Sequence, residues 1–512
     1  MISKISFSIN TSYREKKIVE DAVIFLLVAT GIILATIQFF FNRSLWNDEA
    51  SLALNIIQKN SFDLLKPLDY QQVAPILFIQ FEKLFTTILP NSEYGLRLFP
   101  LICYCTTLFI FSKLLKICLK NKISVIFALS IFVLNLTILY YSSEVKQYMS
   151  DVLVIVTNYF FLLKTYKNEN DRLVTISTIG IVSILLSHVA PMILFTIGLY
   201  LVYDFLFIKK RSITPLLKTF LLWFLFFSIY YINLIHKHPG RDYMITFWSK
   251  LGTFMTLNPF DSAFYEFFIK FFKYLFQTLL PFSVAGAIVL PLLLLSGLVL
   301  KIKRKEYGFA ILTVVPVVMH LILSSFQMYP VSPRLILYFT PLLILLISSG
   351  FDLFLDILKN KVSTNYLQFS VIIILLFTVF NFTGKDFPIR KREIKKSIDY
   401  IQQNFRNGDN LFVDRSADRA FRYYEKIGYF KSELPVTYGF VKNFIKSKEK
   451  FPGKESVWIL TVGPKQINYN NENDIVGKTG IKFKEVFKTK GSNVYLFKSR
   501  KNLKKNKDDK KN

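Results

Sequence analysis

Residues that build disulfides and metal sites are scarce in this sequence. Its 512 residues include only three cysteines and four histidines. Cys103 and Cys105 are two positions apart and point to different sides of a helix, so we expect no disulfide between them. Cys118 completes the set, and the spacing of the three is not that of a metal site. We interpret the cysteines as small packing residues.

Acidic residues are also few, with 35 Asp and Glu against 64 Lys and Arg and a net charge of +29. Such a balance can indicate a nucleic-acid partner. Here, however, the positive charge is spread among short loops and the C-terminal tail. Membrane topology and anionic lipid head groups explain this distribution better, so we predict no nucleic-acid partner.

Hydrophobic residues are abundant, at 52% of the chain, and 16% of the residues are aromatic. Apolar runs of about 18 to 22 residues recur, which is the length that a bilayer demands. We therefore expect a polytopic α-helical membrane protein with about eleven transmembrane helices. They are expected near residues 22–41, 97–117, 123–140, 149–165, 173–188, 190–208, 215–235, 276–300, 308–325, 334–356 and 367–383.

The segment Val73–Leu89 decides the topology. It is apolar but short, and it contains Gln80, Glu82 and Lys83. If it does not cross the membrane, five basic loops lie on the same side as the N-terminus, as the positive-inside rule requires. These loops are 113–122, 164–172, 209–211, 301–305 and 359–361. We predict an amphipathic helix on the outer surface, within a first outer loop over 42–96. We expect a cytoplasmic N-terminus over 1–21 and interpret the first span as an uncleaved signal anchor.

The composition changes after Phe382, and short strands alternate with helices from there on. We predict a transmembrane domain over 22–383, a small extracytoplasmic α/β domain over 384–500 and a basic disordered tail over 501–512. The α/β domain has no glycine-rich phosphate loop. Its expected helices are Arg392–Phe405 and Ala417–Lys426, and its expected strands are Leu411–Val413, Val457–Val462 and Val494–Phe497.

Two adjacent carboxylates, Asp48 and Glu49, follow the first span. One interpretation is structural: Asn47 caps a helix, and the acids lie in its first turn, where the helix dipole favours negative charge. The other is catalytic, at the membrane surface. The centres of the spans hold almost no charge, whereas a transporter usually has its ionisable site near the midplane. The polar residues gather instead in the outward loops.

The next outer loop, Tyr140–Tyr148, also carries polar groups. Glu144 gives a third carboxylate, while Lys146 and Tyr148 can reach a phosphate or sugar hydroxyls. An interfacial aromatic belt with a snorkelling lysine is the alternative. That alternative explains the tyrosines well and Glu144 poorly.

Two arginines, Arg241 and Arg334, lie on the outer face against the topology bias. Such an arginine can bind a lipid phosphate through two parallel hydrogen bonds. Alternatively, its side chain can snorkel, with the stem along apolar surface and the guanidinium in water.

Three further positions have a binding and a structural interpretation. His188 can bind substrate or cap a turn. His236 and His238 have the spacing of a metal pair but lack further local ligands. Gln72 can hydrogen-bond a sugar or simply open a helix ahead of Pro75.

Four segments in order resemble the bacterial branch of the protein O-mannosyltransferase and aminoarabinose-transferase-like enzymes, which are polytopic C-type glycosyltransferases. The resemblance covers about residues 20–350. It rests on the segments 45–50 (LWNDEA), 72–77 (QVAPIL), 96–100 (LRLFP) and 141–148 (YSSEVKQY).

The resemblance implies a location in the bacterial plasma (inner) membrane, a polyprenyl-phosphate sugar donor and surface-lying helices in the first outer loop. It makes Asp48 the leading catalytic carboxylate and Glu144 a second active-site acid. The family commonly has a basic residue and a double proline where this chain has Gln72–Pro75, so the sugar and one phosphate contact are left open.

The resulting hypothesis is an inverting transfer in which Asp48 takes the proton of an acceptor hydroxyl and the polyprenyl phosphate leaves. The phosphate would be stabilised by three cations: Lys146, Arg241 and Arg334. Glu49 and Glu144 would orient hydroxyls, and a divalent cation, if used, would bind Asp48 and Glu144. The acceptor is a lipid, as in lipopolysaccharide modification, another cell-envelope glycan or a protein.

Two other functions fit the many spans. A flippase or exporter of lipid-linked glycans should have charged residues inside the bilayer core, where this chain has few. A non-catalytic membrane scaffold would not need acids in two separate outer loops.

Overall fold

The computed structural model describes residues 2–90, 92–279, 284–359, 387–430, 434–441, 456–463 and 482–498. The chain forms two compact units. The first, here called the helical unit, comprises Met1–Phe40, Ser61–Glu82 and Arg97–Phe387. The second, called the mixed unit, comprises Phe41–Asn60, Lys83–Leu96 and Pro388–Asn512. The segment around Asp48 therefore belongs with the C-terminal residues. The domain limits expected from composition remain predictions.

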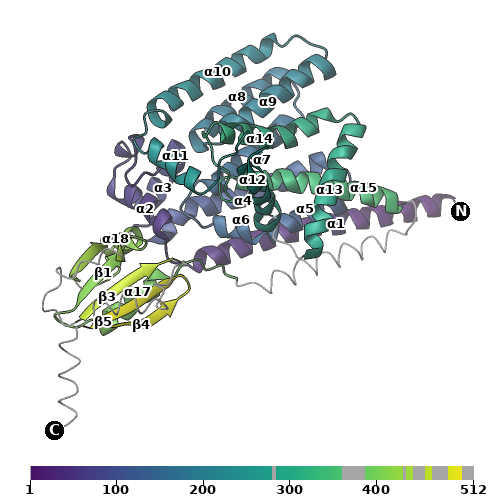
Figure 1. The fold of residues 1–512 in the computed structure, drawn as a ribbon. Coiled ribbons are helices and arrows are strands. Elements are labelled where there is room, and N and C mark those ends of the chain that lie inside the picture. Colours follow the sequence, from purple (N-terminus) through teal and green to yellow (C-terminus); the bar gives the residue numbers. More distant parts are fainter. Residues whose placement is uncertain are drawn as a thin grey trace, which may run out of the picture. The chain divides into compact units, whose positions relative to one another are not determined.

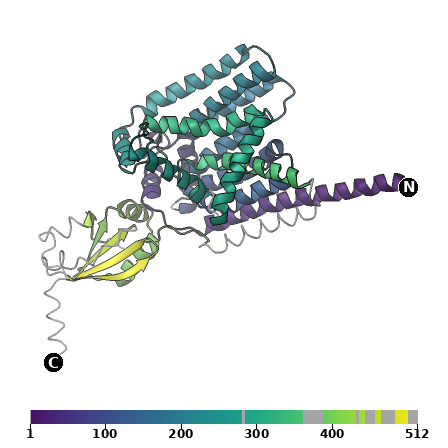
Figure 2. The ribbon, with the colours of Figure 1, turned by 45° about the vertical axis from the view of Figure 1, so that its right-hand side comes forward.

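The helical unit is built from helices (Figure 1), many of them apolar. In the described residues, six are long and apolar enough to cross a membrane: Val19–Phe40, Glu93–Cys118, Ala190–Ile208, Thr214–Ile235, Tyr307–Ser325 and Leu337–Ile357. The first of these is the end of the long helix α1, Ile2–Phe40, which extends to the N-terminus (Figure 2). The chain is thus a multi-pass membrane protein, and the predicted fold class is confirmed.

The remaining helices explain where the expected spans differ from the structure. The expected span 123–140 is two helices, α5 (Lys122–Val133) and α6 (Leu136–Tyr141). They divide at Asn135, whose side chain accepts the N–H of Ile138 at 3.0 Å and so starts a new helix. The expected span 367–383 lies outside the described residues.

The other α-helices of this unit follow in order, and α4 belongs to it from Arg97 onward. They are α4 (Glu93–Cys118), α7 (Tyr148–Leu163), α8 (Glu169–Leu186), α9 (Ala190–Tyr203), α10 (Thr214–Tyr230), α11 (Arg241–Lys250), α12 (Ser262–Lys273), α13 (Val284–Lys303), α14 (Tyr307–Ser325) and α15 (Thr340–Lys359).

The segment expected on the outer surface is helix α3, Ile76–Ile88. Its 13 residues are fewer than a span requires, in agreement with a segment that does not cross. Phe78, Ile79 and Glu82 are buried. Its position at the outer surface stays a prediction.

Two glycines allow α13 and α15 to pack at close range. A Cβ on Gly297 would overlap the carbonyl oxygen of Leu346, and a Cβ on Gly350 would overlap that of Leu293. Small residues at a helix contact let the backbones approach in this way.

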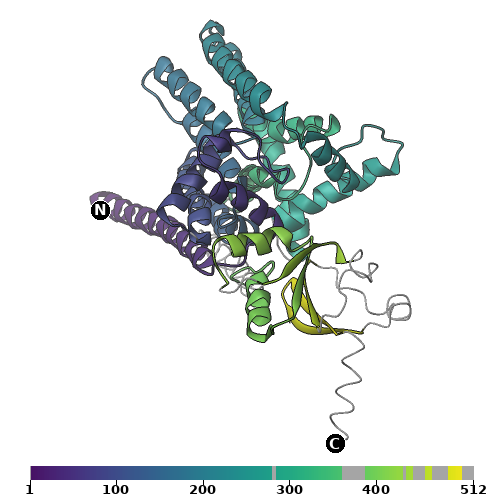
Figure 3. The ribbon, with the colours of Figure 1, turned by 90° about the vertical axis from the view of Figure 1, so that its left-hand side faces the viewer.

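In the mixed unit, a five-stranded sheet has the strand order β2-β1-β3-β5-β4. Strand β1 pairs in parallel with β2 and β3, whereas β5 is antiparallel to β3 and β4. The yellow strands β4 and β5 lie side by side in Figure 3. The strands are β1 (Asn410–Asp414), β2 (Val436–Gly439), β3 (Ser456–Val462), β4 (Lys482–Thr489) and β5 (Ser492–Lys498).

Three helices complete the mixed unit: α2 (Asn47–Gln58), α17 (Ile394–Asn404) and α18 (Asp418–Lys426). Helix α17 packs on β3, β4 and β5, and α18 packs on β1 and α2. Tyr400 of α17 stacks on Phe487 with ring centroids 4.4 Å apart. The expected helices and three expected strands are confirmed; β2 and β4 were not predicted.

Candidate active site

The two adjacent acids lie in the first turn of α2, where the helix dipole favours negative charge. The helix begins at Asn47, with Trp46 as its N-cap. The carboxylate of Glu49 accepts the backbone N–H of Trp46 at 3.4 Å, which satisfies one N–H at the helix start. The structure therefore confirms the position expected for the acids, but the N-cap is Trp46 and not Asn47.

Burial separates Glu49 from Asp48. Glu49 is fully buried, and Nη1 of Arg43 donates to its two oxygens at 3.2 and 3.1 Å. The two side chains are 0% and 1% exposed. Asp48 is only partly buried. Of the two acids, Asp48 is thus the one that a reacting group can approach, while Glu49 belongs to a buried ion pair.

Asn47 caps a helix far away in sequence. Its Oδ1 accepts the backbone N–H of Arg419 at 2.9 Å, and its Nδ2 donates to the carbonyl of Arg415 at 3.4 Å. Arg419 lies in the first turn of α18, where backbone N–H groups have no partner within the helix. Asn47 therefore joins the start of α2 to the start of α18.

The C-terminal residues also hold the chain that precedes Asn47. The N–H of Leu45 donates to the hydroxyl of Tyr424 at 2.8 Å, and this hydroxyl donates to Glu93 at 3.0 Å. The backbone N–H of Lys395 donates to Oγ of Ser44 at 3.1 Å.

Two cationic side chains add to these contacts. Nζ of Lys395 donates to the carbonyl of Asn42 at 2.9 Å and pairs with Glu93 at 2.7 Å. Nζ of Lys391 lies 4.3 Å from the centroid of the Trp46 ring. We call residues 42–49 the acidic segment. Its conformation is fixed by side chains and backbone groups of the C-terminal residues.

A second group of predicted site residues meets inside the helical unit, and we call Gln72, Lys146 and His238 the lysine cluster. Nζ of Lys146 donates to Oε1 of Gln72 at 2.6 Å. Nε2 of His238 is 3.0 Å from the carbonyl of Gln72, and Nδ1 of His238 accepts the N–H of Gly240 at 3.1 Å. Because Nδ1 accepts, the ring proton is on Nε2 and is donated to Gln72.

The lysine cluster also contains a shifted pKa, and the backbone just before Gln72 has unusual angles. Burial lowers the pKa of His238, against the opposing effect of its hydrogen bond to the Gln72 carbonyl. Ahead of Gln72, Tyr70 and Gln71 have left-handed backbone angles, φ +61° and +52°. Such angles are costly for residues other than glycine and persist only where surrounding contacts impose them.

Arg334 lies between two aromatic rings. Its Cζ is 6.0 Å from the centroid of Tyr148 and 5.2 Å from that of Trp248. Tyr148 in turn makes an edge contact with Tyr141, with centroids 5.3 Å apart. The sequence predicted Arg334 and Tyr148, but Trp248 on α11 was missed because nothing in its local pattern indicates a cation partner.

The other predicted residues of this unit are placed separately. Glu144 is fully buried in the turn between α6 and α7, where its carbonyl accepts the N–H of Lys146 at 2.7 Å. His188 is 3.1 Å from the hydroxyl of Tyr230. Arg241 is exposed at the first position of α11. Among the described residues, no three His, Cys, Asp or Glu side chains form a group that could hold a metal ion.

The fold defines a class, the polytopic membrane proteins with a small mixed domain. Within that class, the structure is similar to the crystal structure of ArnT from Cupriavidus metallidurans bound to undecaprenyl phosphate, with a TM-score of 0.52 and 11% identity, over 92% of this chain and 97% of ArnT. The structure of the same ArnT in the apo state aligns with a TM-score of 0.49 and 10% identity, over 95% and 98%. No protein-family model and no curated protein sequence matches the chain. At this identity the likeness shows a shared fold.

Proposed function

We propose that this protein is a membrane glycosyltransferase that moves a sugar from a polyprenyl-phosphate donor to an extracytoplasmic acceptor. The observation that carries the proposal is the separation of the two acids: Glu49 is held in a buried ion pair, whereas Asp48 is presented in the first helical turn with part of its surface accessible. The ArnT fold supports it, since the solved ArnT is bound to undecaprenyl phosphate.

Asp48 is the general base. It takes the proton of an acceptor hydroxyl while the hydroxyl oxygen attacks the anomeric carbon, and the bond to the polyprenyl phosphate breaks with inversion. The leaving phosphate carries off the bonding electron pair. Glu49 acts indirectly, because its bonds to Arg43 and to the N–H of Trp46 fix the turn that carries Asp48.

Cations of the helical unit stabilise the leaving phosphate. Lys146 is mostly buried, and Gln72 directs its ammonium group. Arg334 is oriented by the rings of Tyr148 and Trp248. Arg241 is exposed and gives a third positive group. Glu144 and His188 form hydrogen bonds with the hydroxyl groups of the sugar.

The donor fits a membrane location. Its lipid tail stays among the apolar helices while its sugar is at the water interface, so the reaction belongs at the outer face of the bacterial plasma membrane. The acceptor is an envelope lipid such as lipopolysaccharide, a glycan or a protein.

Transfer of labelled sugar tests the proposal. Purified full-length protein in lipid nanodiscs is mixed with a polyprenyl-phosphate fraction labelled in its sugar and with envelope acceptors. We expect Asp48→Asn to lower transfer by at least about 100-fold, since general bases contribute 10²–10⁴-fold. The matched control is Asp242→Asn, an exposed acid in the first turn of α11.

An Asp48→Asn variant that transfers sugar at the wild-type rate would remove Asp48 from the base role. Movement of the labelled lipid across the nanodisc or vesicle bilayer without any transfer would favour the flippase instead.

A further inference from the structure

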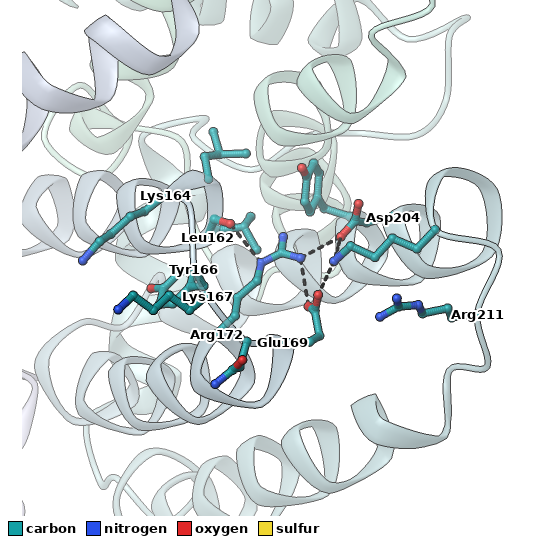
Figure 4. Close-up of a pocket in the computed structure, with 12 residues that line it drawn as sticks. Leu162, Lys164, Tyr166, Lys167, Glu169, Arg172, Asp204 and Arg211 are labelled. Atoms are coloured by element: carbon teal, nitrogen blue, oxygen red, sulfur yellow. Dashed lines mark hydrogen bonds and ion pairs between the residues drawn. The ribbon is translucent and has the colours of Figure 1, made fainter.

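A separate cavity of about 520 Å³ lies where α7 ends, α8 begins and the segment after α9 begins. None of its lining residues belongs to the acidic segment or the lysine cluster. The lining is Leu162, Leu163, Lys164, Tyr166, Lys167, Asn168, Glu169, Arg172, Tyr200, Asp204, Lys209 and Arg211. Figure 4 shows these side chains around the opening.

An ion-pair network forms the floor of this cavity. Arg172 pairs with Asp204 at 2.7 Å and with Glu169 at 3.1 Å, and its Nε donates to the carbonyl of Leu162 at 3.2 Å. Lys209 pairs with Asp204 at 3.0 Å. Arg172 is mostly buried, so the network fixes the three backbone segments that meet here. Two cations are thereby balanced by two carboxylates.

Three further cations have no such balance. Lys164, Lys167 and Arg211 are exposed, and none has a carboxylate partner within the part of the chain that the structure describes. Lys164 and Lys167 lie to one side of the network and Arg211 to the other (Figure 4). The cavity therefore has an excess of three positive charges. This excess favours a phosphate group.

An apolar surface borders the cavity. Leu206, Phe207 and Ile208 precede Lys209 directly, and they are 45%, 68% and 61% exposed. In a multi-pass membrane protein such a surface contacts acyl chains. A phosphate bound among the three cations would thus have its own lipid tails beside Phe207 and Ile208, which favours a lipid over a soluble phosphate compound.

We propose that this cavity is a binding site for the phosphate head group of an anionic membrane lipid, which bridges Lys164 and Lys167 to Arg211 and closes the junction of α7, α8 and α9. The site is independent of the proposed transferase activity. Binding should weaken with ionic strength, because the three cations are at the surface.

The test measures retention of a phospholipid by the full-length protein. The protein is exchanged into nanodiscs of phosphatidylcholine with a trace of fluorescent phosphatidylglycerol, and bound lipid is quantified by native mass spectrometry and by energy transfer from the protein. The triple variant Lys164→Gln, Lys167→Gln, Arg211→Gln removes the excess charge and leaves the buried network intact. We expect about 100-fold weaker retention, at roughly 1 kcal/mol for each cation.

The control variant carries the same charge change elsewhere: Lys113→Gln, Lys250→Gln, Lys303→Gln, at three exposed lysines outside the cavity. It should retain phosphatidylglycerol as the wild type does. A second variant, Lys164→Arg with Lys167→Arg, should also retain it. Equal losses in the triple variant and the control, or no loss in either, would overturn the site.

Competition identifies the source of the phosphate. Inorganic phosphate and glycerol 3-phosphate at millimolar concentration should not displace the lipid from the wild-type protein. If they displace it completely and bind the wild type but not the triple variant, the cavity is a site for soluble phosphate compounds and the lipid assignment is wrong.

Discussion

The acidic segment and the lysine cluster hold their functional groups in different ways. In the acidic segment, Asn42, Ser44, Leu45 and Asn47 each bond to the C-terminal residues, and Glu49 is fixed by a buried arginine. In the lysine cluster, the contacts come from neighbouring loops, and the cation is at the end of a long side chain.

This difference suits the two proposed tasks. A general base works only if its oxygen is held within hydrogen-bond reach of the proton it takes, so a rigid frame is an advantage. A cation that follows the charge of a departing phosphate gains from a side chain that can adjust. The C-terminal α/β residues would then act as the frame for Asp48.

The largest effect is expected from the buried ion pair of the acidic segment. Arg43→Met removes the buried guanidinium that donates to both oxygens of Glu49, which should cost about 3–5 kcal/mol in the free energy of unfolding. Denaturant unfolding of the purified protein measures it. The double variant Arg43→Met, Glu49→Leu should recover most of that loss, because the buried charge is gone.

Recovery of stability need not recover activity. If Glu49 positions the turn that carries Asp48, the double variant should be stable and still slow in sugar transfer, with a lower kcat. A double variant with wild-type kcat would mean that the ion pair has no part in placing Asp48.

An intermediate effect is expected at the junction of α2 and α18. Asn47→Ala removes the oxygen that accepts the N–H of Arg419, and loss of such a cap costs about 1 kcal/mol. Asn47→Asp keeps an acceptor oxygen there and should restore most of the stability. Thermal unfolding followed at the tryptophans compares the variants.

The control for this junction is Asn404→Ala. Asn404 is exposed on α17, and its side chain bonds to the carbonyl of Tyr400 within the same helix. Only Asn47→Ala should also lower kcat. Equal kcat in the two variants would show that the C-terminal residues do not position Asp48.

Asn47 also shows where prediction from the sequence ends. Locally, an Asn before two acids indicates a cap for its own helix. In the structure, Asn47 caps α18 instead. Its partner Arg419 is 372 residues away, so no local sequence pattern predicts that pairing. Likewise, only the family resemblance favoured Asp48 over Glu49 at the level of the sequence. The local pattern does not distinguish the two acids, because their difference in burial is made by Arg43 and the surrounding packing.

The fold was more predictable than the site. Long apolar runs identify membrane helices almost by themselves, and β3 has the continuous apolar pattern of a strand in the middle of a sheet. Strand β2 was missed because it has only four residues, none of them fully buried. Strand β4 was missed because Lys482, Lys484 and Lys488 interrupt its apolar pattern.

The smallest effect is expected from pH at the lysine cluster. The pKa of His238 is lowered from its usual value of 6.5 mainly by burial, so the neutral ring is the form that donates to Gln72. As the pH falls below about 6.5, the undocked histidine takes up a proton before the docked one does. The stability that docking contributes is therefore present above pH 6.5 and is lost as the pH falls through the lowered pKa.

Hydrogen exchange of the peptide that contains Gln72, measured from pH 7.5 to 5, reports this loss after correction for the intrinsic rate. Protection should fall in the wild type, whereas in His238→Gln it should no longer depend on pH. His236→Gln changes an exposed histidine two residues away and should behave as the wild type. The same pH range should leave the acidic segment protected, because the bonds described above join it to Lys395, Tyr424 and Arg419. Simultaneous loss of protection in both regions would mean that the acidic segment and the lysine cluster are coupled and do not act separately.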